Sequence, residues 1–306
     1  VSNTIQTPVQ YYYFERAAGN LFNNPNLKPV RTVDYQVGFQ QKLTNSSALK
    51  IAAYYREQKD LIQSQVFSFL PAPVNSYESY GNLDFGTTKG FSFTYERRRT
   101  NNLELTATYT LQFAEGTGSD FLGASDQISA GQGNLRSIRP LSFDSRHLLT
   151  VTLDYRYGTG SKYDGPKIKD FELFGNMGLN LITRARSGTP YSRAEVPTPE
   201  GQFAVAGRTR LDGQINGSRL PWNYKLDMRI DRDIPLNFSK EGKASNRSLN
   251  VYVQIQNLLN TQNQLSAYAA TGSGSDDGYL KSGNGIEDAN NRTSTNSFQY
   301  LYGLKV

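Results

Sequence analysis

Residues 103–113 read 103-LELTATYTLQF-113, with an apolar or aromatic residue at every odd position and Glu, Thr or Gln at every even one. Successive side chains of a β-strand point to opposite faces, so this stretch predicts a strand with one apolar face and one polar face. A helix would need apolar residues three and four positions apart, and that spacing is rare in this chain. The stretch therefore indicates a β-sheet.

The same alternation recurs along most of the chain and predicts an all-β fold of about nine strands. Soluble β-sandwiches and transmembrane β-barrels both have alternating strands, so this pattern alone does not separate the two classes. The nine alternating segments are residues 33–39, 49–55, 91–95, 103–113, 149–157, 171–181, 224–230, 249–255 and 298–306.

The links between these segments alternate in length, which favours the barrel. Outer-membrane barrels have brief turns on the periplasmic side and long loops outside, whereas a compact soluble domain seldom contains several structureless loops of more than thirty residues. We therefore predict an antiparallel transmembrane β-barrel, with 97–102 and 237–247 as periplasmic turns. The predicted external loops are residues 114–145, 188–223 and 263–296.

Composition excludes several other classes. The chain has no Cys and a single His, which excludes disulfides, thiolate metal sites and His clusters. No window has the roughly 18–20 consecutive apolar residues of a membrane-spanning helix. The net charge of +6 is scattered, and its densest run, 97-RRR-99, accompanies no nucleic-acid-binding motif. The run is better explained as a solvated turn.

Charged residues occupy the polar face of the predicted strands, and a barrel would place them in its lumen. We expect Glu104, Asp154, Asp227 and Arg229 to face the lumen, and Leu105, Tyr109, Val151, Leu153, Leu226, Met228 and Val253 to face lipid. Rings near strand ends would form interfacial girdles, although ordinary packing between strands explains any single ring equally well. These rings are Tyr109, Tyr155, Tyr157, Trp222 and Tyr224.

The sequence offers no convincing catalytic or metal motif, so we expect neither an enzyme nor a cofactor. The stretch 158-GTGSK-162 lacks the spacing of a phosphate-binding loop and is read as a turn. His147 follows Asp144 and Ser145 too closely on an extended strand to form a triad with them. The loop 275–291 departs from the calcium-loop spacing, so solvation is its default role and Ca²⁺ binding an alternative. Its candidate ligands are Asp276, Asp277, Glu287 and Asp288.

Several phrases resemble the β-barrels of TonB-dependent receptors, especially the carboxypeptidase-regulatory-like or Oar-like type. The stretch 251-VYVQIQNLLNTQN-263 resembles the family's penultimate strand, which ends in an Asn-Leu-Leu-Asn element, here Asn257, Leu258, Leu259 and Asn260. The other phrases occur in the family's order and cover most of the chain. They are 24-NPNLKPVRTVDYQVGFQ-40, 54-YYREQKDLIQ-63, 143-FDSRHLLTVTLDYRYG-158, 187-SGTPYS-192 and 219-RLPWNYKLDMRIDRDIPL-236, where Val30 replaces the family's usual Glu.

The resemblance implies a 22-stranded barrel in the outer membrane of a Gram-negative bacterium, filled by an N-terminal plug and energised through TonB. Residues 1–306 would then form the C-terminal part of that barrel, and the plug and earlier strands would lie outside this chain. The family usually ends on an aromatic residue, so the end at Val306 suggests that one or two residues are missing.

The resemblance also implies partners and site residues. The expected partners are outer-membrane lipid, the plug, TonB, and a surface lipoprotein or another outer-membrane protein, but no nucleic acid. The candidate lumen-facing or plug-facing residues are Asp154, Arg156, Asp227, Arg229 and Asp231, and residues 257–260 form the strand-end motif.

Two other functions remain open, and the transported ligand is undetermined. One is a passive or structural barrel, such as a porin, an adhesin platform or a component of an outer-membrane assembly. The other is a soluble β-sandwich lectin, which would partition into buffer without detergent.

Overall fold

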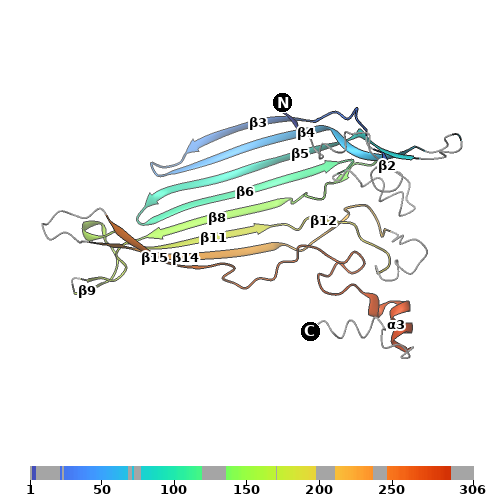
Figure 1. Ribbon diagram of the computed structural model, residues 1–306. Coiled ribbons are helices and arrows are strands. Elements are labelled where there is room, and N and C mark those ends of the chain that lie inside the picture. Colours follow the sequence, from blue (N-terminus) through green and yellow to red (C-terminus); the bar gives the residue numbers. More distant parts are fainter. Residues whose placement is uncertain are drawn as a thin grey trace.

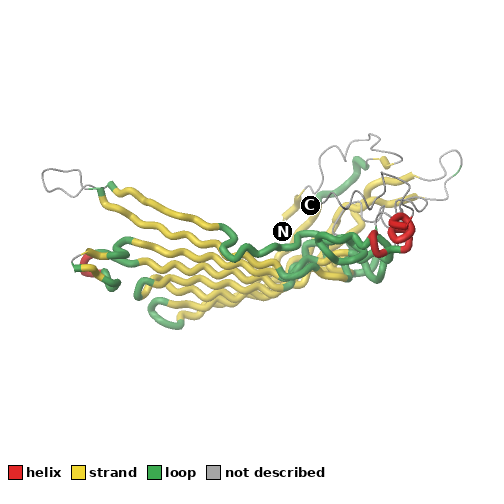
Figure 2. The backbone as a smooth tube through the Cα atoms, turned by 90° about the horizontal axis from the view of Figure 1, so that it is seen from below, coloured by secondary structure: helices red, strands yellow, loops and turns green. Residues whose placement is uncertain are grey.

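A computed structural model describes residues 2–4, 21–22, 24–67, 71, 77–118, 136–169, 171–197, 211–236 and 247–290. These residues form one curved antiparallel sheet, whose main strands run in the order β1-β3-β4-β5-β6-β8-β11-β14-β15 (Figures 1 and 2). Its strands are β1 (Ser2–Thr4), β3 (Val30–Lys42), β4 (Ser47–Phe67), β5 (Tyr77–Thr100), β6 (Leu103–Gly116), β8 (His147–Arg156), β11 (Met177–Arg186), β14 (Asn223–Pro235) and β15 (Ser248–Ile255). The predicted all-β antiparallel fold is confirmed.

Short elements complete the described structure. Strands β2 (Leu21–Phe22) and β7 (Arg139–Pro140) join the main sheet, and two small hairpins stand apart from it. These are β9 (Lys167–Ile168) with β10 (Phe171–Glu172), and β12 (Pro190–Tyr191) with β13 (Ser218–Arg219). The helical turns are η2 (Gly160–Lys162), η3 (Tyr279–Lys281) and α3 (Gly283–Asn290). Among the described residues, no helix has the length and apolar character needed to cross a membrane.

One predicted strand boundary was wrong. The alternation from Phe171 predicted a strand over residues 171–181, but β11 begins at Met177. Phe171 instead pairs with Ile168 in the small hairpin. Asn176 adopts a φ of 55°, which interrupts an extended chain and redirects it into β11. The predicted strand 298–306 lies outside the described residues.

The register confirms that the predicted apolar residues share one face of the sheet. Leu105 pairs with Leu153, Leu153 with Leu181, Leu181 with Met228, and Met228 with Ile255. Similar rows cross β3 to β6. Because register partners point to the same side, the apolar face is continuous from β3 to β15, and the predicted polar residues lie on the opposite face.

This apolar face is left largely exposed. Val37 is 72% exposed, Phe91 52% and Val253 61%. Buried apolar residues lie elsewhere, for example Leu27 and Leu141 in loops and Ile62 toward the end of β4. Contiguous apolar patches of this kind mark an interaction surface rather than a surface kept in water.

Connection lengths give the sheet two distinct ends (Figure 1). At one end, here called the short-turn end, residues 43–46 join β3 to β4 and the pair Asn101–Asn102 joins β5 to β6. Both Asn residues have positive φ, at 49° and 69°, as a two-residue hairpin turn requires. At the opposite, long-loop end, β6 and β11 are followed by the two longest connections between main strands, residues 117–146 and 187–222, and α3 also lies at this end (Figure 2).

Candidate functional site

A polar groove lies on the polar face of β8, β11, β14 and β15. Its volume is about 660 Å³. All five candidate plug-facing residues line it, together with Asn180, Ile182, Met228, Asp233, Asn250 and Gln254, whereas Glu104 does not. The fold therefore brings together residues of β8 and β14 that are more than seventy positions apart in the sequence. They are Asp154, Arg156, Asp227, Arg229 and Asp231.

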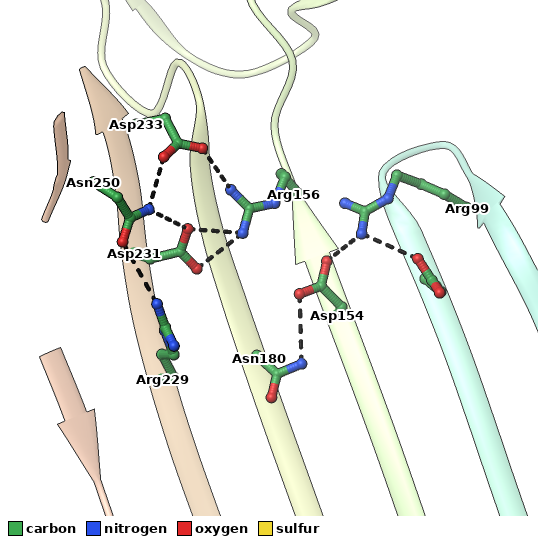
Figure 3. Close-up of polar contacts among 9 residues, drawn as sticks. Arg99, Asp154, Arg156, Asn180, Arg229, Asp231, Asp233 and Asn250 are labelled. Atoms are coloured by element: carbon green, nitrogen blue, oxygen red, sulfur yellow. Dashed lines mark hydrogen bonds and ion pairs between the residues drawn. The ribbon is translucent and has the colours of Figure 1, made fainter. Parts of the chain in front are cut away.

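The centre of the groove is the pair Arg156 and Asp231 (Figure 3). Arg156 Nη2 donates to both carboxylate oxygens of Asp231, at 2.9 and 2.7 Å. Arg156 Nη1 lies 3.6 Å from Asp233 Oδ2. Asn250 Nδ2 donates to Asp233 Oδ1 at 2.7 Å and, at 3.4 Å, to Asp231 Oδ2. Asp231 is buried, and a buried carboxylate is stable only when it is paired in this way.

A second set of contacts extends this polar surface across β8 to β5. Arg99 donates to Asp154 and, at 3.1 Å, to Glu104 Oε2. Asp154 Oδ2 also accepts from Asn180 Nδ2 at 3.5 Å (Figure 3). Arg99 belongs to the run 97-RRR-99, which was predicted to be a solvated turn. Its guanidinium instead links carboxylates of β6 and β8.

Asp227 connects the groove to the strand-end motif. Its Oδ1 accepts the backbone N–H of Asn257 at 2.9 Å, and Arg184 and Lys225 lie 3.2 Å from its carboxylate. Asn257 has a φ of 53° and its side chain bonds the backbone N–H and C=O of Thr261 at 3.0 and 3.1 Å. The chain thus turns directly after β15 and stays bonded to β14.

Arg229 differs from the other groove cations. Its guanidinium lies 4.3 Å from the ring centroid of Tyr252 and donates to Asn250 Oδ1 at 3.5 Å. Within the described part of the chain it forms no ion pair. The remaining groove charges are all in ion pairs, either with one another or with Arg99, Arg184 and Lys225 beside the groove. This arrangement suits a packing surface rather than proton transfer.

Sequence reasoning missed a junction that joins three of the family-like phrases at the long-loop end. Asp144, only 1% exposed, accepts hydrogen bonds from the Arg219 guanidinium and from the backbone N–H of Ala114, the latter at 2.8 Å. Ser145 Oγ donates to the Ser187 carbonyl at 2.7 Å. A Cβ at Gly188 would lie 1.8 Å from the Leu220 carbonyl oxygen, so this crossing requires glycine.

His147, predicted to be a strand-end residue, begins β8 and lies in an aromatic row. Its Nδ1 lies 2.8 Å from Tyr109 Oη, and its ring stacks on Trp222 with centroids 5.5 Å apart. Tyr109 in turn stacks on Phe93 at 6.4 Å. A second cluster, at the short-turn end, includes Tyr155 and Tyr157 at 5.2 Å. The row spans several strands, a pattern that alternation within one strand could not reveal.

A further buried carboxylate, Asp84, lies between the long strands and the loops. Asp84 accepts from Gln63 Nε2 and Thr117 Oγ1, both at 2.8 Å, and from Arg136 Nη2 at 3.1 Å. A Cβ at Gly118 would approach the Asp84 carboxylate closely. Nothing in the local sequence around Asp84 signals this role.

The acidic loop holds the carboxylates of Asp276 and Asp277 with its own atoms. Asp276 Oδ2 pairs with Lys281 Nζ at 2.8 Å, and its Oδ1 accepts the Gly278 N–H at 2.9 Å. These two contacts hold the pKa of Asp276 below its ordinary value. Asp277 Oδ1 accepts the Tyr279 N–H at 3.0 Å. Among the described residues, no group of three His, Asp or Glu side chains is placed to hold a metal ion.

Comparison with known proteins identifies the architecture. Residues 1–258 match the family model described as TonB dependent receptor-like, beta-barrel. The outer membrane transporter YddB from Escherichia coli has a similar fold, with a TM-score of 0.53 and 12% identity, over 83% of this chain and 32% of that one. The ferric-catecholate import receptor Fiu from Escherichia coli gives a TM-score of 0.45 and 12% identity, over 83% of this chain and 27% of its own. No curated protein matches the chain.

Proposed function

Because this chain belongs to the TonB-dependent receptor-like β-barrel family, we propose that it forms part of the wall of an outer-membrane barrel that takes up a ligand with energy supplied through TonB. The chain spans about a third of the length of YddB. The proposal therefore concerns the longer protein, in which residues 1–306 supply the C-terminal strands of the wall.

The observation that carries the proposal is the division of the sheet into two continuous faces. Apolar rows run from β3 to β15 on one side, while ion pairs such as Arg156–Asp231 lie on the other. A barrel wall has this arrangement because one face contacts hydrocarbon and the other encloses the lumen.

Two open edges support the assignment to a larger barrel. Among the described residues, β15 pairs with β14 alone and is exposed along its whole length, and β3 pairs on its outer side only through residues 30–32. Unpaired backbone groups are strongly unfavourable in hydrocarbon, so the wall must close with further strands.

We also propose that the polar groove packs against a plug inside the lumen. All of its charges except Arg229 are paired within the wall by contacts such as that between Arg156 and Asp231, so a plug can cover these paired charges without leaving them unneutralised. Replacing Asp231 by Asn should loosen this packing and sensitise cells to antibiotics too large for porins. An Arg193→Ala variant in an exposed pair with Asp212 is the matched control.

The test of transport uses the full-length gene. Cells would be screened with iron chelates, oligosaccharides and peptides for a solute whose uptake depends on the gene. That uptake is then measured with and without the plug segment and with and without a working TonB. Loss of uptake without TonB is expected, whereas undiminished uptake would favour a passive or structural barrel.

A further inference from the structure

The apolar face contains a second groove, distinct from the polar groove described above. Its volume is about 720 Å³, and the side chains that line it on the apolar face are almost all aromatic or aliphatic. They include Tyr35, Val37, Tyr55, Phe91 and Phe113, and one cation, Lys89, lies among them. Asp34 also lines the groove, but its carboxylate is paired with Arg56 at 2.6 Å. The groove is therefore suited to an amphiphile with an anionic group.

Lys89 lies within a row of rings. In the sheet register Tyr35 pairs with Tyr55, Tyr55 with Lys89, and Lys89 with Phe113. All four side chains therefore point to the apolar face. The aliphatic stem of Lys89 can lie along these rings while its ammonium group reaches a polar layer.

The charge of Lys89 is weakly neutralised. Its nearest carboxylate oxygen, Glu115 Oε2, is 4.0 Å away, and the Lys89 side chain is 58% exposed. Glu57, on the same face, is held at 3.0 Å by Lys59. Arg31 pairs in register with Lys59 and forms no ion pair within the described residues. The three cations of this patch (Lys89, Lys59 and Arg31) and its two carboxylates (Glu115 and Glu57) give it a net charge of +1.

Lys89 lies at the height in the membrane where we expect lipid headgroups. It lies four residues from Phe93, a member of the aromatic row, or about 13 Å along β5 toward the long-loop end. Aromatic rows mark the membrane interface, and a cation on the outward face is tolerated there but not in hydrocarbon.

We propose that this groove binds a phosphorylated membrane lipid, with an acyl chain along Tyr35, Tyr55 and Phe91 and the phosphate at Lys89. The inference rests on the proposed membrane location of the sheet. A phosphate matches the exposed ammonium group through charge-assisted hydrogen bonds, and the chain matches the apolar lining.

The test compares lipids on the purified full-length protein in detergent by native mass spectrometry. The probes are dilauroyl phosphatidic acid and dilauroyl phosphatidylcholine, which share their acyl chains. We expect a preference for phosphatidic acid of about fivefold or more, lost in Lys89→Gln and retained in Lys89→Arg. Lys50→Gln is the control, because Lys50 lies on the polar face of β4 and is paired with Glu96 at 2.7 Å.

Three outcomes would overturn the lipid site: no preference in the unaltered protein, equal loss in Lys50→Gln, or displacement of the lipid by millimolar inorganic phosphate. The last would indicate a simple anion site. Failure of the proposed membrane location is a separate result, because the protein would then remain soluble without detergent and would not insert into vesicles.

Discussion

Arg219 donates to Asp144 twice, once to its carboxylate and once, at 2.9 Å, to its backbone carbonyl. This contact joins the segment before β8 to the segment before β14. Because Asp144 is buried, removing Arg219 would leave its charge with the Ala114 N–H and the more distant Arg146, whose Nε lies 3.7 Å away.

We therefore expect Arg219→Ala to destabilise the folded barrel by about 3 kcal/mol or more. The measurement is the urea midpoint of the full-length protein in lipid vesicles, followed by heat-dependent gel mobility. Arg193→Ala is the control, since its pair with Asp212 is exposed and contributes about 1 kcal/mol or less. Equal midpoints for the two variants would contradict a stabilising role for the Asp144 contact.

The strand-end motif should also be sensitive to substitution. Asn257→Ala loses all three side-chain hydrogen bonds to Thr261 and places Ala at positive φ, which together cost about 2 kcal/mol or more. Leu259→Ala, at an exposed position in the same motif, should cost much less. Both variants are compared by urea titration, and a larger effect at Leu259 would show that the motif acts through its apolar residues.

The orientation of the strands can be tested at adjacent positions. Leu153 lies in an apolar row between Leu105 and Leu181, whereas Thr152 lies on the polar face. Leu153→Arg should cost about 2–4 kcal/mol if the position is near the membrane midplane, and Thr152→Arg much less. The measurement is the yield of folded protein in vesicles. Equal yields would contradict a lipid-facing row.

The two ends of the sheet are expected to lie on opposite sides of the outer membrane, with the long-loop end outside the cell. The chain lacks Cys, so a single introduced thiol reports one position within it. Ser275→Cys, at the exposed loop after β15, should react with a membrane-impermeant maleimide on intact cells. Asn45→Cys, in the short turn between β3 and β4, should react only after the outer membrane is opened. The opposite pattern would invert the assignment of the two ends.

The sequence predicted those features that depend on the spacing of residues within one strand, such as the direction of each side chain. The alternation around Leu105 and Leu153 was sufficient to assign their common face, because the period of a strand fixes side-chain direction. It failed at Phe171, where alternation continued into a hairpin whose end is set by the backbone at Asn176. The Asp144–Arg219 contact was not predictable, because it joins loop residues far apart in the chain.

In the polar groove, too, the sequence predicted the face on which each charge lies but not the residue with which it pairs. Charges at Asp154 and Asp231 were visible as polar positions of alternating strands, but their partners depend on register across β8, β11 and β14. Register is a property of pairing between strands, and no single segment contains it.

The most direct test of the membrane-wall account is the environment of Trp222, the sole Trp of the chain, which is 59% exposed beside His147. In the full-length protein, with any other Trp replaced by Phe, its fluorescence would be measured in vesicles that contain brominated lipids. The account predicts strong quenching by bromine near the headgroup end of the acyl chains and weak quenching by aqueous acrylamide. Strong quenching by acrylamide and none by any brominated lipid would contradict it.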